Sequence, residues 1–148
     1  MDAVELIKQD HRHIQKLVAR FLETESDLSQ EDLYQQIQAG LNAHADMEEQ
    51  IFYPVIKPFA PDAVQEAIED HVEVKELLDD LLGSDLNEEE FEAEFRELME
   101  DVRYHIEQEE SPGGLLDLAR RNLDPQKLEE MGEQIRKMRG DIPEDLAA

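Results

Sequence analysis

Residues 37–55, IQAGLNAHADMEEQIFYPV, contain the pattern that decides the fold. Apolar and ligand-capable residues recur there in alternating steps of four and three. On an α-helix of about 3.6 residues per turn, such steps form one continuous stripe. A histidine and a glutamate therefore lie on a helix face that should point into a core. The stripe consists of Ile37, Leu41, His44, Glu48, Ile51 and Val55.

The second half of the chain repeats this arrangement. HADME at residues 44–48 has a counterpart in HIEQE at residues 105–109, and DHRHIQKLVARF at residues 10–21 aligns with DHVEVKELLDDL at residues 70–81. A helical hairpin thus occurs twice. The second stripe consists of Phe91, Phe95, Leu98, Val102, His105 and Glu109.

The other helix of each hairpin also carries a histidine on its apolar face. Periodicity predicts one helix from Asp2 to about Glu23 with His11 on the inner face. It predicts another that begins at Pro61 or the next residue, with His71 on the inner face. The sequence therefore places one histidine on the apolar face of each of four helices.

Local signals set the expected helix ends. We expect a turn at residues 26–30, an Asn87 N-cap on the fourth helix and a glycine C-cap at residues 83–84 on the third. Pro54 and Pro58 should kink and then end the second helix, because proline lacks a backbone donor and crowds the preceding turn.

These elements define the expected fold class and domain organisation. Short connections favour antiparallel neighbours, so the sequence predicts an all-α, up-down-up-down four-helix bundle. SPGG at residues 111–114 interrupts the fourth helix, and one or two short C-terminal helices should follow. We expect the bundle over residues 1–123. A C-terminal helix and a frayed tail, packed on the bundle or trailing it, should occupy residues 124–148.

The composition narrows the function classes. A formal net charge of -25 creates a field that repels phosphate backbones and anionic lipid, so we expect no nucleic-acid or membrane partner. No apolar run approaches about 18 residues and no basic-then-apolar leader precedes the first helix, which favours a cytoplasmic protein. The chain has no cysteine, so any metal must be held by nitrogen and oxygen ligands.

The inward polar groups are the candidate metal ligands. A buried carboxylate is normally paired or bound to metal, because burying it alone is costly. If both glutamates bridge, each of two metals receives two nitrogens and two oxygens, which suits iron better than zinc or manganese. A single inward histidine is more often an ordinary core residue, but four of five histidines in two copies of one pattern favour metal. The candidate ligands are His11, His44, Glu48, His71, His105 and Glu109.

At these residues the sequence resembles the hemerythrin-like HHE cation-binding domain family. The resemblance covers most of the chain, from DHRHI at residue 10 through HADMEEQIFYPVI and EDHVEV to HIEQEE. It implies a four-helix bundle that holds two iron ions, oxo- or hydroxo-bridged, with the six candidates on the ligand positions and Glu48 and Glu109 as the bridges. Ferritin-like carboxylate proteins are the rival class, but they use more carboxylates than imidazoles.

The sequence departs from the oxygen-carrying hemerythrins at two places. Where those have a second histidine one turn after the third-helix ligand, this chain has Lys75, which removes a nitrogen donor. Lys75 either extends to solvent or donates a hydrogen bond near the second metal. The second departure is SPGG at residues 111–114, where family members usually continue the helix, and it could loosen that end of the site.

Several other polar residues are expected to have ordinary structural roles. His13 lies on another face of its helix from His11 and should be exposed. Asp10 and Asp70 should mainly be solvated, with orientation of imidazoles as the alternative. The tyrosines should pack in the core, with Tyr34 as the one whose hydroxyl could approach the centre. The acidic run at residues 88–101 should be a solvated face or a surface that captures iron.

These observations lead to an expected function with one alternative. The chain should be a non-haem di-iron protein that binds, senses or reacts with dioxygen, peroxide or nitric oxide, or handles iron. A peroxide- or nitric-oxide-related enzyme activity is one form of this function. The alternative is a helical interaction or regulatory module braced by metal, without redox chemistry. The expected partner is a small diatomic ligand or peroxide, and a homo-oligomer or a protein partner stays open.

Overall fold

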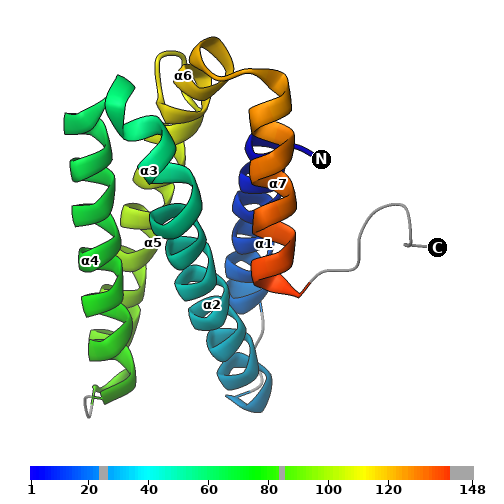
Figure 1. The fold of residues 1–148 in the computed structure, drawn as a ribbon. Helices are drawn as coiled ribbons and strands as arrows, with labels where there is room; N and C mark the ends of the chain where they lie inside the picture. Colours follow the sequence, from blue (N-terminus) through cyan, green and yellow to red (C-terminus); the bar gives the residue numbers. More distant parts are fainter. Residues whose placement is uncertain (24–26, 84–85, 141–148) are drawn as a thin grey trace.

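The computed structural model describes residues 1–23, 27–83 and 86–140, and nearly all of them are helical. Figure 1 shows four long helices that run alternately up and down, joined and followed by shorter helices. The predicted all-α, up-down-up-down bundle is therefore confirmed. The long helices are α1 (Ala3–Glu23), α2 (Asp27–Met47), α4 (Pro61–Gly83) and α5 (Glu88–Glu110). The shorter elements are η1 (Glu48–Phe52), α3 (Tyr53–Ile56), η2 (Lys57–Phe59), α6 (Leu115–Asn122) and α7 (Pro125–Arg139).

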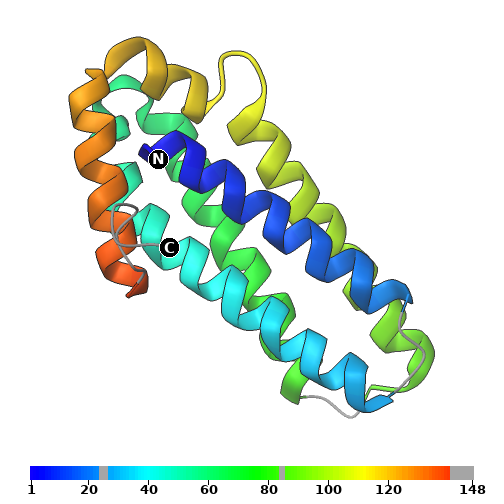
Figure 2. The same cartoon turned by 90° about the vertical axis from the view of Figure 1, so that its right-hand side faces the viewer.

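The two predicted hairpins are present. α1 packs along α2, and α4 packs along α5. Seen from the side, α6 and the beginning of α7 lie at one end of the bundle, and α7 then descends beside α1 (Figure 2). The connection between the hairpins, through η1, α3 and η2, lies at the same end.

Side-chain caps fix the starts of several helices. The Glu5 N–H donates to Asp2 Oδ1 over 2.9 Å, and the Asp2 N–H donates back to Glu5 Oε1 over 3.4 Å, which is a capping box. The Glu90 N–H donates to Asn87 Oδ1 over 2.9 Å, so the predicted Asn87 cap is confirmed.

Two of the expected helix ends need comment. The turn expected at residues 26–30 is wrong, because α2 already begins at Asp27. No glycine or proline at residues 27–30 stops the helix from extending back over them. The frayed tail at residues 141–148 and Ser84 of the expected C-cap lie outside the described residues.

A π-helical turn changes the register of the second helix. In η1 the Tyr53 N–H bonds to the Glu48 carbonyl, five residues back, and so one extra residue is inserted beyond the α-helical repeat. Pro54 follows directly and cannot donate to the ladder. Phe52 and Ile56 are therefore fully buried, whereas Ile51 and Val55 of the predicted stripe are half-buried.

The bundle contains two apolar clusters. The first joins the beginning of α1 to the end of α2, η1, α3, the beginning of α4, α6 and α7, and includes Ile7, Met47 and Phe52. The second joins the rest of α1 to α2, α4 and α5, and includes Ile14 and Leu41. Burial in these clusters is the main stabilising term of a helical bundle.

The C-terminal segment turns sharply after α5. A Cβ on Gly114 would lie 2.3 Å from the Gln108 carbonyl oxygen, so only glycine fits where the chain folds back onto the end of α5. Asp124 caps α7, whose Leu128 and Met131 belong to the first apolar cluster. Two short C-terminal helices are thus present, while the domain boundary at residue 123 stays a prediction.

Within the described ranges, none of the helices combines the length and the apolar character needed to cross a lipid bilayer.

Candidate metal centre

The histidines lie at the junction of the two apolar clusters. On α1, His11 lies between Ile7 of the first cluster and Ile14 of the second. On α2, His44 lies between Leu41 of the second and Met47 of the first. On α4, His71 likewise lies between Ala67 of the first cluster and Val74 of the second, whereas His105 on α5 has Val102 and Ile106 of the second cluster on either side. The histidines thus form a polar layer where the two apolar clusters meet. All six candidate ligands are buried, with exposed fractions of 0% to 7%: His11, His44, Glu48, His71, His105 and Glu109.

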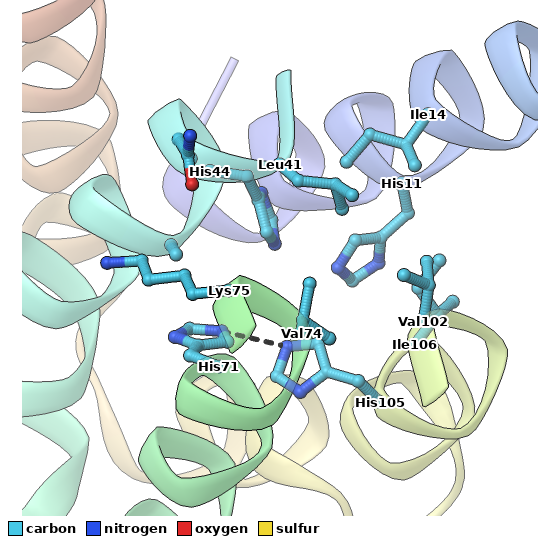
Figure 3. A pocket seen from close by; sticks show the side chains of 12 residues that line it. His11, Ile14, Leu41, His44, His71, Val74, Lys75, Val102, His105 and Ile106 are labelled. Atoms are coloured by element: carbon cyan, nitrogen blue, oxygen red, sulfur yellow. Dashed lines mark hydrogen bonds between the residues drawn. The ribbon is translucent and has the colours of Figure 1, made fainter. Parts of the chain in front are cut away.

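The six side chains converge on one point. One ligand atom each of His44, Glu48, His105 and Glu109 lies within 4.8 Å of the others. The remaining two histidines border this group: His11 Nε2 is 3.1 Å from Glu109 Oε1, and His71 Nε2 is 3.2 Å from Glu48 Oε1. Figure 3 shows the four imidazoles turned toward one another from four helices. The structure thus brings together every residue that the sequence nominated.

The imidazoles form two pairs. The ring centroids of His11 and His44 are 4.9 Å apart, and those of His71 and His105 are 4.7 Å apart. Between the pairs, the His44 and His105 centroids are 6.5 Å apart. In each pair, one imidazole comes from the first helix of a hairpin and the other from the second helix of the same hairpin. The centre therefore offers two pairs of donor nitrogens side by side.

Each glutamate lies within reach of both pairs. Glu48 Oε1 is 2.8 Å from His44 Nε2 in one pair and 3.3 Å from His105 Nε2 in the other. Glu109 Oε1 is 3.1 Å from His11 Nε2 and 3.3 Å from His105 Nε2. A carboxylate in contact with two adjacent donor pairs has the geometry needed to bridge two metals.

An outer carboxylate faces the Nδ1 atom of every histidine in the centre. A carboxylate only accepts, so these contacts favour a proton on Nδ1, and with metal bound each Nε2 would present its lone pair to the centre. The Nδ1–oxygen distances are 2.6 Å for His11 and Glu110, 3.0 Å for His44 and Asp10, 3.2 Å for His71 and Glu49, and 3.8 Å for His105 and Asp70.

Arginines hold two of these outer carboxylates. The Arg12 guanidinium contacts Glu110, whose other oxygen accepts from His11. The Arg139 guanidinium, at the end of α7, contacts Asp10. Both arginines act on the pair formed by the α1 and α2 histidines. The C-terminal helix therefore contributes to the surroundings of the centre.

The outer carboxylates show what the sequence prediction missed. Glu49 and Glu110 were not nominated. For Asp10 and Asp70 the favoured solvated position is wrong, and the alternative, contact with an imidazole, is what the structure has. Each aspartate contacts the histidine of the neighbouring helix, not the one beside it in the sequence. The repeat contained a usable signal, because both copies read Asp-His at the first ligand and Glu-Glu at the last.

Tyr53 is a second residue that the sequence prediction did not single out. Its side chain is 1% exposed, its hydroxyl donates to Glu109 Oε2 over 2.8 Å, and its ring stacks on that of His71. Burial and the charges of Glu48 and Glu109 raise the pKa of Tyr53, so the hydroxyl keeps its proton. Tyr34, the tyrosine we expected to approach the centre, instead donates to the Leu78 carbonyl in the second apolar cluster.

Protons balance the buried charges when no metal is present. Burial alone would lower the pKa of His44, but the charge of the adjacent Glu48 and the hydrogen bond to Asp10 raise it to about 10. Burial would raise the pKa of Glu48, but the charge of His44 and several hydrogen bonds hold it well below its usual value. A metal ion must therefore displace protons from the imidazoles.

The donor set fits a pair of divalent or trivalent metal ions. Four of its buried atoms have no hydrogen-bond partner among the described residues: His11 Nε2, His44 Nε2, Glu48 Oε2 and Glu109 Oε1. Buried polar atoms without partners are rare in proteins, and metal coordination would satisfy all four. Imidazole nitrogen with carboxylate oxygen suits iron, manganese and zinc.

Two further polar residues lie where the sequence suggested. His13 is exposed, as expected. The Lys75 ammonium points away from the histidines and lies 3.8 Å from Asp46 Oδ1, and both side chains are about half exposed. Lys75 therefore extends to the surface and is not a ligand in this structure.

A small cavity adjoins the four imidazoles. Its volume is about 30 Å³, and its walls away from the histidines are mainly apolar (Figure 3). These walls come from α1, α2, α4 and α5 and include Ile14, Leu41, Val74, Val102 and Ile106. The stem of Lys75 lies at its edge.

A helical bundle with a buried histidine–carboxylate cluster belongs to the class of metal-binding four-helix proteins. The sequence model of the hemerythrin HHE cation-binding domain matches residues 2–112. The chain therefore belongs to the hemerythrin HHE cation-binding family. Metal binding is the property that the family and the cluster support together.

Two known proteins resemble the chain beyond this match. The crystal structure of a hemerythrin HHE cation-binding domain-containing protein from Mycobacterium kansasii has a TM-score of 0.78 and 22% identity, and covers 95% of this chain and 86% of that one. A protein of Nostoc sp. named a DNA nickase is 26% identical over 147 residues, which are 99% of this chain and 41% of the relative. The chain thus spans about two fifths of that relative.

Proposed function

We propose that this protein is a non-haem di-iron protein that reacts with a small oxidant, either peroxide or nitric oxide. We propose this reaction in preference to reversible binding of dioxygen. The observation that carries the proposal is the pairing of four imidazoles around two shared carboxylates, with a small apolar cavity against the imidazoles. His11 and His44 would hold one iron, and His71 and His105 the other. Glu48 and Glu109 would bridge them.

The ligand count supports reaction with an external molecule. Each iron would receive two nitrogens and two carboxylate oxygens from the chain, which leaves up to two octahedral positions for a bridging oxygen and a small ligand. Lys75 adds no donor, since its ammonium lies near Asp46. The oxygen-carrying hemerythrins have a histidine at this position, so an iron held by His71 and His105 would have one nitrogen ligand fewer here and a more open site.

The cavity limits the size of the reactant. A volume of about 30 Å³ has room for only one or a few water-sized molecules. Diatomic molecules and peroxide fit such a space, and larger organic substrates do not. Mainly apolar walls favour small neutral molecules and keep bulk water away.

Residues of the chain would control protons and ligand orientation. A bound iron pair supplies the electrons for reducing an oxidant. The Tyr53 hydroxyl keeps its proton and donates to Glu109, so it can hold that carboxylate in one position. The outer carboxylates hold the imidazole rings by their Nδ1 protons, as with Asp10 and His44.

Metal analysis followed by spectroscopy tests this proposal. Protein purified without added metal should contain close to two irons per chain, with absorption bands of an oxo-bridged pair that change when peroxide is added. Rapid mixing of the reduced protein with dioxygen should give oxidation, not an adduct that releases dioxygen under vacuum. A stable, reversible adduct would overturn the preference for peroxide or nitric oxide.

The alternative is a metal-braced interaction module without redox chemistry. Its signature would be a loss of stability on metal removal together with no reaction with peroxide, nitric oxide or dioxygen. Catalytic turnover of peroxide would instead make the protein an enzyme. Repeated additions of peroxide to the iron-loaded protein distinguish turnover from a single reaction.

DNA is a candidate substrate because the relative from Nostoc sp. is named a DNA nickase. The chain has a formal net charge of -25, which repels a phosphate backbone, so we propose that it does not bind DNA by itself. Supercoiled plasmid incubated with the iron-loaded protein should stay supercoiled. Nicking that is lost in a His44→Ala variant would overturn this expectation.

A further inference from the structure

A second pocket reaches the metal centre from another direction. Its volume is about 100 Å³, and it lies between α4, α5 and the turn after α5. His105 and Glu109 line it, and both are buried ligand candidates. Glu66 and Gln108 also line it, and both are exposed, so the pocket extends from the surface to the centre.

The turn after α5 creates this pocket. α5 ends at Glu110, one residue after the last ligand candidate, and the chain folds back at Gly113 and Gly114. Gly113 has a positive φ of 81°, and a Cβ on Gly114 would collide with the end of α5. A longer α5 would continue past this point. The SPGG segment thus leaves one side of Glu109 open.

Acidic side chains line the way in. Glu66 and Asp70 lie one turn apart on α4 and both border the pocket. Outside the pocket, burial and the charges of Glu73, Glu97 and Asp70 raise the pKa of Asp101 on α5. The carboxylates are therefore close enough to repel one another. Such a concentration of negative charge attracts cations.

The inner end of the pocket contains a carboxylate oxygen suited to receive a cation. Glu109 is 1% exposed, and its Oε1 atom forms no hydrogen bond among the described residues but lies 3.1 Å from His11 Nε2 and 3.3 Å from His105 Nε2. Its other oxygen accepts from Tyr53. The pocket therefore leads from the exposed Glu66, past the half-buried Asp70, to a buried carboxylate that faces the imidazoles.

The two cavities beside the centre differ in chemistry. The cavity lined by Leu41 and Val74 is apolar, and a hydrated divalent ion would lose its water there without replacement ligands. The pocket lined by Glu66 and Asp70 offers oxygen ligands that can replace those waters step by step. The apolar cavity thus suits neutral reactants, and the acidic pocket suits metal ions.

We propose that the pocket of Glu66, Asp70 and Glu109 is the access route by which divalent metal ions reach the centre. The ion first exchanges water for the Glu66 and Asp70 carboxylates and then passes to Glu109 and His105. This inference rests on the proposed function, because it assumes that the centre takes up metal. It extends that proposal by assigning a path to the metal.

The kinetics of metal uptake test the route. Metal-free protein is mixed rapidly with cobalt(II), whose visible absorption reports binding to nitrogen and oxygen ligands, in wild type, Glu66→Gln and Glu69→Gln. Glu69 is also an exposed acid of α4, but it does not line the pocket. The two variants change the net charge equally and leave all six candidate ligands in place.

The expected result is slower uptake only in the pocket variant. Removing one charge beside a divalent ion should slow uptake about three- to tenfold in Glu66→Gln at low salt, and less than about twofold in Glu69→Gln. The final amount of bound cobalt should be unchanged in both. Equal rates in the two variants would overturn the route while leaving metal binding intact. Failure of the wild type to bind cobalt would overturn the route and the metal centre together.

Discussion

The hydroxyl of Tyr53 should stabilise the centre, and removing it gives a measurable prediction. Tyr53→Phe leaves Glu109 Oε2 without its donor in a site that is 1% exposed. A hydrogen bond to a charged group contributes about 1.5–3 kcal/mol. For a protein of this size, about 1 kcal/mol changes the melting temperature by roughly 2–4 °C. The metal-free variant should therefore melt about 3–12 °C below the wild type.

Tyr34→Phe is the matched control. Tyr34 is also buried, but its hydroxyl donates over 3.0 Å to the neutral Leu78 carbonyl. Loss of that hydrogen bond should cost only about 0.5–1.5 kcal/mol. Urea unfolding of both metal-free variants gives the two free energies directly. The reasoning predicts the larger loss for Tyr53→Phe.

Metal affinity provides an independent comparison of the same two variants. Loss of a partner that holds a metal ligand typically lowers affinity about 10- to 100-fold. Tyr53→Phe should show a decrease of about tenfold in competition with a chelator, and Tyr34→Phe should match the wild type. A Tyr53→Phe variant as stable and as metal-avid as Tyr34→Phe would refute the role of this hydroxyl.

Three other expected outcomes concern the histidines and the C-terminal helix. His71→Ala should lower the bound metal per chain, whereas His13→Ala should not, as measured by elemental analysis. Arg139→Gln should weaken metal binding about two- to tenfold, and the exposed Lys137→Gln should leave it unchanged in chelator competition. The pKa of His44 is raised to about 10, so its charged form stabilises the metal-free protein below pH 6.5, and this contribution disappears as pH rises toward 10. Urea unfolding of the metal-free protein should show this decline, several kcal/mol in size at about 1.4 kcal/mol per pKa unit. His44→Gln should reduce the decline but not abolish it, because the pKa of His105 is also raised.

The burial of the candidate ligands could be predicted because these residues follow helical periodicity. His11 and His71 align with apolar neighbours three and four residues away, so the stripe alone places them inside a bundle. Convergence then required only that four antiparallel helices pack together. The internal repeat strengthened the prediction, because both hairpins contain the same spacing of histidine and glutamate.

The π-helical turn shows why part of the second stripe was misplaced. A period of about 3.6 residues predicts burial of Ile51 and Val55, but the inserted residue in η1 moves burial to Phe52 and Ile56. The same shift places Tyr53 at the centre. No propensity rule signals a π turn, although a proline one residue later is compatible with one.

The outer carboxylates depended on packing between helices. Asp10 reaches His44 on α2, and Glu49 reaches His71 on α4. A sequence gives the face on which each carboxylate lies, but the residue opposite is set by how the helices cross and by their relative heights. Such contacts can be predicted only after the bundle geometry is known.

The repeated hairpin has a consequence for how the centre is assembled. The hairpin α1–α2, with the η1 turn after it, provides two imidazoles and Glu48, and the hairpin α4–α5 provides two imidazoles and Glu109. Two of the four outer carboxylates cross between the hairpins, since Glu110 contacts His11 and Glu49 contacts His71. Neither hairpin alone provides the full set of side chains, so the centre is complete only once both hairpins have packed together.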